Sequence, residues 1–233
     1  MTQDFHDPEG VRQWDSNPVR LNPTRPEQLD LLVSILADAY QAGDTILDLG
    51  FGSGIVEALI FERIPQARII GVDFSPTMMA LAHERLKPYA DQYRAIEHNL
   101  AELDTLALEP CRFIISIQAL HHLTDAQMQA AYRRIVDLLA PGGLFLLLDR
   151  MAAEPPNLFE VYQSVWRWQD RRYGSHLAQD EGDSYPVHVH NNRERGDLPL
   201  SLPRHLELMD SVGLKAACLH LIGLRALIAA TKS

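Results

Sequence analysis

The sequence predicts a single α/β domain in which parallel strands form a sheet with helices on both faces. From Thr45 onward, short apolar runs alternate with longer runs of helical periodicity, the pattern of repeated strand–helix–strand units. A glycine-rich loop joins the first of these strands to its helix. The length of 233 residues, with 46% hydrophobic residues, suffices for one core.

The individual elements follow from apolar spacing and from start and stop signals. Strands are predicted at 45–49, 68–73, 93–98, 112–118, 144–149, 215–221 and 225–231. Helices are predicted at 24–42, 55–64, 75–86, 124–140, 158–173 and 201–213. Thr24 with Glu27, and Thr124 with Gln127, have the spacing of a capping box, and Ser75 precedes a proline at the first helical position.

Composition limits the partners and the compartment. A net charge of -10 argues against a broad basic surface for nucleic acid. Cys111 and Cys218 lie far apart and form no metal or disulfide pattern, as expected in a reducing compartment. The first ten residues are polar, and no apolar run is long enough to span a bilayer. We therefore expect a cytoplasmic protein without a membrane segment.

The strongest motif is the run Asp48-Leu49-Gly50-Phe51-Gly52-Ser53-Gly54 between the first strand and its helix. Its glycines permit a tight turn and a close approach of a ligand to the backbone, at the sheet edge where open α/β folds bind nucleotides. A plain strand-to-helix turn is the alternative. A dinucleotide fingerprint needs G-x-G-x-x-G, but the last position, counted from Gly50, is Ile55. The pattern therefore disfavours NAD.

This loop, with Asp73 closing the next strand, resembles motif I of the class I S-adenosylmethionine-dependent methyltransferases. The resemblance covers about 45–151 closely and the C-terminal tail loosely. It implies S-adenosylmethionine as cofactor and a Rossmann-like three-layer sandwich. The sheet would be seven-stranded and mostly parallel, with an antiparallel C-terminal strand beside the fifth.

Within this single methyltransferase domain of 1–233 the sequence suggests four parts. They are an N-terminal arm and cap helix at 1–42, a cofactor-binding core at 43–149, a lid insertion at 150–200, and a C-terminal helix and β-hairpin at 201–233.

The resemblance assigns cofactor contacts along the strand ends. Asp73 would accept the ribose hydroxyls, although it could instead cap the next helix beside Ser75, and Phe74 would border the adenine. Asn99 stands where the family usually has an acid; its carbonyl can accept the same hydrogen bond, but asparagine is also an ordinary turn residue. The candidate cofactor-binding residues are Asp48, Gly50, Phe51, Gly52, Gly54, Asp73, Phe74, Asn99, Leu100, Gln118 and Ala119.

The histidines suggest acid–base chemistry. His121 follows the fourth strand, near the expected methyl group, and is the candidate catalytic base. His122 beside it raises the possibility of metal, but loop neighbours usually diverge and such a site needs further ligands, so we expect no metal. His188 and His190 share one face of any extended segment, where they could be bases, ligands or part of a solvated loop.

Two further features are less specific. The helix at 158–173 carries Tyr162, Trp166, Trp168 and Tyr173, an aromatic stripe that is more often core than a substrate platform. Trp14 and Arg25 precede the core and could cap the cofactor.

The sequence therefore predicts methyl transfer to an O, N or C atom of a small molecule. The acidic charge balance and the long predicted lid favour a small-molecule substrate over nucleic acid. An RNA or protein methyltransferase, an NAD(P)-dependent oxidoreductase and a non-catalytic adenosylmethionine-binding module are the alternatives.

Overall fold

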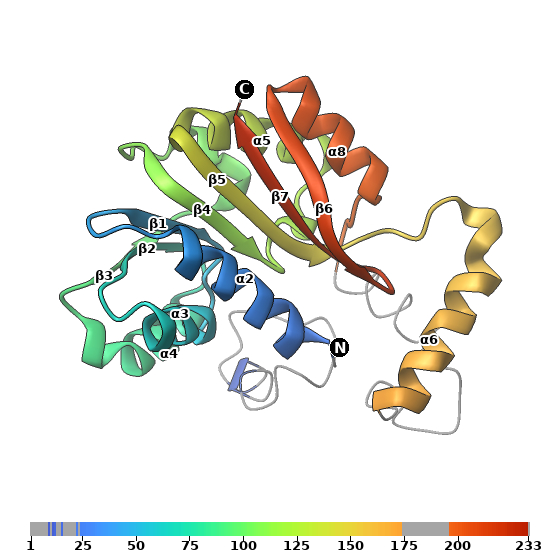
Figure 1. The fold of residues 1–233 in the computed structure, drawn as a ribbon, viewed down its shortest axis with the longest axis horizontal. Coiled ribbons are helices and arrows are strands. Elements are labelled where there is room, and N and C mark those ends of the chain that lie inside the picture. The colour runs from blue at the N-terminus through green and yellow to red at the C-terminus, as the bar shows by residue number, and fades with distance from the viewer. Residues whose placement is uncertain are drawn as a thin grey trace.

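Seven strands form one sheet in the order β3-β2-β1-β4-β5-β7-β6 (Figure 1). The computed structural model describes residues 9, 11, 12, 15, 22, 24–173 and 196–232. The strands are β1 (Thr45–Leu49), β2 (Arg68–Asp73), β3 (Tyr93–Glu97), β4 (Cys111–Ile117), β5 (Leu139–Arg150), β6 (Leu214–Ile222) and β7 (Arg225–Lys232). Neighbours from β3 to β5 are parallel, whereas β7 is antiparallel to both β5 and β6. The predicted fold is confirmed.

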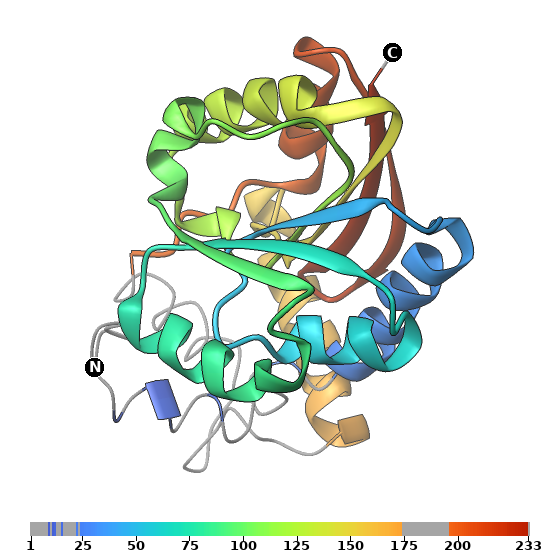
Figure 2. The ribbon, with the colours of Figure 1, turned by 90° about the vertical axis from the view of Figure 1, so that its left-hand side faces the viewer.

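Helices cover both faces of this sheet. They are α2 (Arg25–Ala39), α3 (Ile55–Arg63), α4 (Pro76–Arg85), α5 (Asp125–Leu138) and α8 (Leu202–Ser211), whereas α6 (Phe159–Tyr173) lies away from the sheet (Figure 1). Short 3-10 turns are η1 (Lys87–Tyr89), η2 (Leu100–Thr105), η3 (Leu120–His122) and η4 (Pro156–Leu158). Figure 2 shows α3 and α5 on opposite sides of the sheet. Each face has its own apolar cluster, because strand residues alternate between them.

Alternation along β4 shows how the two clusters arise. Phe113 and Ile115 pack with Leu36 of α2 and Ile60 of α3, whereas Ile114 belongs to the cluster on the α5 face. All are completely buried. The centre of the sheet is thus apolar on both faces, which fixes the register of the strands. Polar side chains that could bind a ligand therefore lie at the ends of the strands.

Two local predictions differ from the structure. The capping box at α5 is present, but the one predicted at α2 is wrong, because Thr24 makes no side-chain cap. Its hydroxyl instead donates to Asn22 Oδ1 at 2.8 Å. β5 begins at Leu139 rather than 144, because Leu139 pairs with Cys111 ahead of an irregularity in the register.

The order of the strands places the site. β1 lies between β2 and β4, so the chain leaves β1 toward one side of the sheet and later continues on the other. Such a switch point opens a crevice at the carboxyl ends of the strands. In the part of the chain that the structure describes, no helix combines the length and the apolar character needed to cross a membrane.

Candidate active site

A cavity of about 320 Å³ lies at the carboxyl ends of the central strands. Its volume is at the lower end of the range of about 300–1,000 Å³ that is usual for small-molecule sites. Every predicted cofactor-binding residue except Gly52 and Gly54 lines it, as does the predicted base His121. The structure therefore brings together residues that span the sequence from the first strand to η3.

Gly50 brings the ends of β1 and β4 together. Its φ is +89°, and a Cβ there would lie 2.2 Å from the Cβ of Ala119. Only glycine fits this conformation and this approach without strain. Gly54, with a φ of +77°, precedes the first residue of α3. These two glycines shape the loop, and Gly50 also forms part of the cavity wall.

Asp73 connects the loop to the end of β2. Its Oδ2 accepts the N–H of Gly52 at 2.9 Å, and its Oδ1 accepts the N–H of Ser75 at 2.9 Å. Ser75, not Asp73, caps α4 by accepting from Met78. Burial raises the pKa of Asp73, although the backbone N–H groups oppose this. Each carboxylate oxygen keeps accepting capacity for a ligand hydroxyl.

Two carboxyl groups lie buried behind the loop. Neither Asp48 nor Glu57 has a hydrogen-bond partner from another described residue, but the two carboxyl groups can share a hydrogen bond when one of them is protonated. Burial, followed by the charge of Glu57, raises the pKa of Asp48 well above its usual range, and burial raises that of Glu57 to about 7. The pair therefore retains a proton near neutrality. Sequence analysis missed Glu57, because in the first turn of a helix an acid is ordinary.

The predicted adenine side is built from the ends of β2 and β3. Phe74 borders the cavity and is 43% exposed. Asn99 caps η2, with its Oδ1 accepting the N–H of Ala101 at 3.0 Å. The turn role considered from the sequence is thus present, and Asn99 lines the cavity as well.

Gln118, directly after β4, has an unusual backbone conformation. Its φ is +54°, the left-handed region, and its N–H donates to the carbonyl of Leu148 at 2.8 Å. Its side-chain Nε2 is buried without a hydrogen-bond partner among the described residues. Strained residues of this kind concentrate at functional sites. A ligand carbonyl or carboxylate would satisfy this donor.

His121 is held by Asp149 at the end of β5. The ring Nδ1 lies 2.6 Å from Asp149 Oδ1, and the His121 backbone N–H donates to Oδ2 at 3.0 Å. Burial alone would raise the pKa of Asp149, but the charge and hydrogen bond of His121 hold it below its ordinary value. When Nδ1 donates to Asp149, Nε2 is the ring nitrogen left to face a ligand. Asp149 closes an apolar strand as Asp73 does, a signal the sequence analysis did not use.

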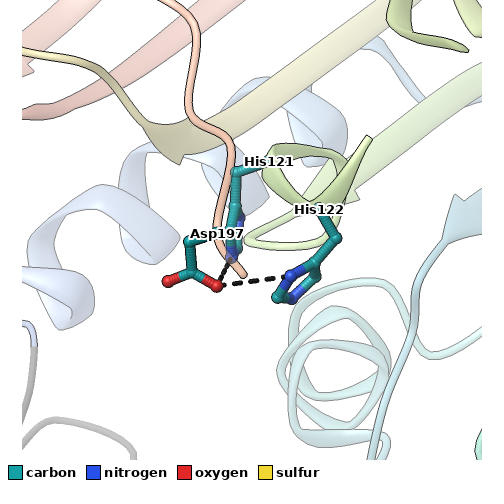
Figure 3. A group of neighbouring side chains, drawn as sticks. All are labelled: His121, His122 and Asp197. Carbon is teal, nitrogen blue, oxygen red and sulfur yellow. Dashed lines mark ion pairs between the residues drawn. The ribbon is translucent and has the colours of Figure 1, made fainter. Parts of the chain in front are cut away.

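A second acid, from the C-terminal end of the predicted lid, approaches the histidines. Asp197 Oδ1 lies 3.3 Å from His122 Nδ1 and 3.7 Å from His121 Nε2 (Figure 3). Its other oxygen is paired with Arg150. Burial and the neighbouring His121 lower the pKa of His122 to about 4, so this ring is neutral near pH 7. Sequence analysis did not single out Asp197, since no spacing relates it to His121.

Of the remaining predicted residues, only Arg25 lines the cavity among those that the structure describes. Burial lowers the pKa of Arg25 to about 10. Trp14, His188 and His190 lie outside the described residues. In α6, Trp166 is buried against Leu224 of the β6–β7 turn. None of the α6 residues lines the cavity.

Residues 46–143 match the methyltransferase domain family. Among curated relatives, the chain is 30% identical over 173 residues to the ubiquinone/menaquinone biosynthesis C-methyltransferase UbiE of Brucella abortus (strain S19), covering 71% of this chain and 61% of that protein. It is 29% identical over 136 residues to the carboxy-S-adenosyl-L-methionine synthase of Geobacter metallireducens, covering 57% of this chain and 56% of the synthase. The chain thus spans little more than half the length of these relatives.

Solved structures share the fold. An O-methyltransferase family protein from Burkholderia thailandensis superposes with a TM-score of 0.70 at 18% identity, covering 98% of this chain and 61% of that one. PigF, solved with SAH, gives a TM-score of 0.64 at 17% identity, with the same two coverages. The sheet order, the glycine loop and the family match agree: residues 46–143 match a methyltransferase domain, and the chain resembles the class I S-adenosylmethionine-dependent methyltransferases.

Proposed function

We propose that this protein transfers a methyl group from S-adenosylmethionine to an O, N or C atom of a small molecule. The observation that carries the proposal is the cavity that joins the Gly50 loop and Asp73 to the buried His121–Asp149 pair. The residues proposed to bind the cofactor and the His121–Asp149 pair therefore border the same cavity. The relatives described as C- and O-methyltransferases support the same class of reaction.

The residues of the cavity fit the cofactor. Asp73 would accept the ribose hydroxyls, Phe74 and Leu100 would border the adenine, and Asn99 would accept from its amino group. Gln118 would donate its unpartnered Nε2 to the methionine part, next to Ala119. The bound cofactor supplies a methyl group activated by a sulfonium.

His121 is the proposed base. Asp149 accepts from Nδ1, which fixes the tautomer and leaves Nε2 to take a proton from an acceptor hydroxyl or amine. A buried Asp that holds the far nitrogen of a histidine also stabilises the imidazolium that forms. His121 is only 2% exposed, so water competes little for the same nitrogen. Holding acceptor and methyl in line within this cavity supplies the rest of the rate enhancement.

The size of the cavity supports a small acceptor. A volume of about 320 Å³ must hold both the cofactor and the reacting part of the substrate, and the net charge of -10 opposes nucleic acid. We propose that the segment 150–200 serves as the lid over the acceptor, with Asp197 at its C-terminal end facing the histidines. The cytoplasmic location remains a prediction.

Transfer of labelled methyl groups tests this function. The protein is incubated with methyl-labelled S-adenosylmethionine and either a metabolite extract or total RNA, and the label is followed into each fraction. We expect label in the small-molecule fraction, reduced about 100-fold or more in His121→Gln because general bases contribute about 10²–10⁴-fold. His83→Gln, on the exposed face of α4, is the matched control. Label in RNA alone would overturn the proposed substrate class.

A further inference from the structure

The side chains of His121, His122 and Asp197 converge beside the cavity. One ligand atom from each lies within 4.8 Å of the other two. Both histidines face the same oxygen, Asp197 Oδ1, at 3.7 Å from His121 Nε2 and 3.3 Å from His122 Nδ1 (Figure 3). We propose that these three residues bind a divalent transition-metal ion, which revises the expectation of no metal drawn from the sequence.

The spacing suits a small ion after a modest adjustment. Zinc lies about 2.0–2.2 Å from nitrogen and oxygen ligands, so tetrahedral ligands are separated by about 3.3–3.6 Å. The separations of 3.3 and 3.7 Å from Asp197 Oδ1 lie near this range, and all three ligand atoms lie within 4.8 Å of one another. Two imidazoles and one carboxylate favour zinc, cobalt, nickel or iron(II) over the oxygen-seeking magnesium and calcium.

The site is held in place by its surroundings. Asp149 fixes the ring of His121 through Nδ1, so that Nε2 is presented to Asp197. Metal-bound histidines usually donate their other nitrogen to a carboxylate in this manner. The N–H of Leu198, the residue after Asp197, donates to the carbonyl of His121 at 2.7 Å. That bond ties the segment carrying Asp197 directly to η3.

Asp197 supplies an independent indication of a missing ligand. Its side chain is only 1% exposed, and Oδ1 has no hydrogen-bond donor among the described residues. Leaving a buried polar atom unsatisfied costs about 1–3 kcal/mol, more when it is charged. Arg150 pairs with the other oxygen, Oδ2, so Oδ1 remains available. A cation between Oδ1 and the two rings removes this cost.

The position of the ion has a consequence for catalysis, and this part alone rests on the proposed function. All three ligands line the cavity, so an open coordination position would face the acceptor. An ion on His121 Nε2 occupies the lone pair that the proposed base needs. Metal binding and proton abstraction by His121 therefore exclude one another, and zinc should inhibit transfer to acceptors that must lose a proton.

Metal titration of the full chain tests the site. Protein stripped with a chelator is titrated with Zn²⁺ by calorimetry and with Co²⁺ by visible absorption, which reports coordination geometry. We expect one ion per chain, bound at least 10-fold more weakly by His122→Gln and by Asp197→Asn. Asp149→Asn should also weaken binding by about 10–100-fold, as loss of outer-shell partners does. His83→Gln should bind as the wild type does.

Several outcomes would overturn the metal site. They are absence of stoichiometric binding, unchanged affinity in both His122→Gln and Asp197→Asn, or loss of binding only when His188 and His190 are replaced. Since His122 is 34% exposed, its replacement by glutamine should leave the fold intact. S-adenosylhomocysteine binding by each variant verifies folding and separates the two proposals: cofactor binding without zinc binding rejects only the metal site.

Discussion

Replacing Gly50 by alanine tests whether the close approach of β1 and β4 builds the site. At a φ of +89° an alanine is strained by about 1–2 kcal/mol. Its Cβ would also lie 2.2 Å from that of Ala119, an overlap whose relief costs about 1–3 kcal/mol in a packed region. We therefore expect Gly50→Ala to lower the free energy of unfolding by about 2–5 kcal/mol and to weaken cofactor binding.

The chain offers a matched control and a rescue. Gly213 has nearly the same φ, +90°, with nothing within 4 Å of its virtual Cβ, so Gly213→Ala should lose only the backbone part, about 1–2 kcal/mol. In Gly50→Ala/Ala119→Gly the nearest atoms are Leu100 Cδ1 at 3.5 Å and the Cα of residue 119 at 3.7 Å. These are ordinary contacts, so the double variant should recover most of the steric loss.

Urea unfolding of wild type, Gly50→Ala, Ala119→Gly, the double variant and Gly213→Ala, followed by circular dichroism, measures these differences. The unfolding free energies also give the coupling between positions 50 and 119 through a double-mutant cycle. Equal losses in Gly50→Ala and Gly213→Ala, or no recovery in the double variant, would refute the steric argument.

Three further predictions concern buried polar groups. Asp149→Asn should lower kcat far more than it changes KM and should alter the pH–rate profile, because an amide no longer fixes the base-competent tautomer of His121; an unchanged profile would refute this. Burial raises the pKa of Glu57 from 4.5 to about 7, so the folded protein binds a proton at Glu57 more tightly than the unfolded chain does. The stability gained from this proton is fully present below pH 4.5 and is lost as pH rises through 7. Glu57→Gln should therefore gain stability relative to wild type between pH 5 and pH 8, by up to about 3 kcal/mol in urea unfolding, and a constant difference would contradict it. Tyr132→Phe should cost about 1–3 kcal/mol by leaving His205 Nδ1, 2.5 Å from the hydroxyl, unpaired in the core; thermal unfolding with no loss would argue against that bond.

Local sequence patterns predicted the sheet and the proposed cofactor-binding residues of the site. Gly50 and Asp73 could be found because a loop and the end of the next parallel strand are related by a regular strand–helix–strand unit. Alternating runs of apolar residues gave the strands, since the core is apolar on both faces of the sheet. The antiparallel placement of β7 came from the resemblance, not from the residues of β7 themselves.

The acids around the histidines could not be predicted in the same way. Asp149 meets His121 because β5 lies beside β4, and Asp197 meets both rings because a distant segment returns to η3. No sequence spacing encodes either contact. The wrong cap at Thr24 has a similar origin, since Asn22 competes for its hydroxyl. The contacts of the histidines with Asp149 and Asp197 therefore arise from tertiary structure and could not be predicted from local sequence patterns.

We propose that the cavity binds an adenosyl cofactor through Asp73. Calorimetric titration with S-adenosylmethionine, S-adenosylhomocysteine and NADH tests it directly, with Asp104→Ala on η2 as an exposed control for Asp73→Ala. We expect both adenosyl ligands to bind, NADH not to bind, and Asp73→Ala alone to weaken binding at least 10-fold. Binding of NADH without the adenosyl ligands, or adenosyl affinity unchanged in Asp73→Ala, would contradict it.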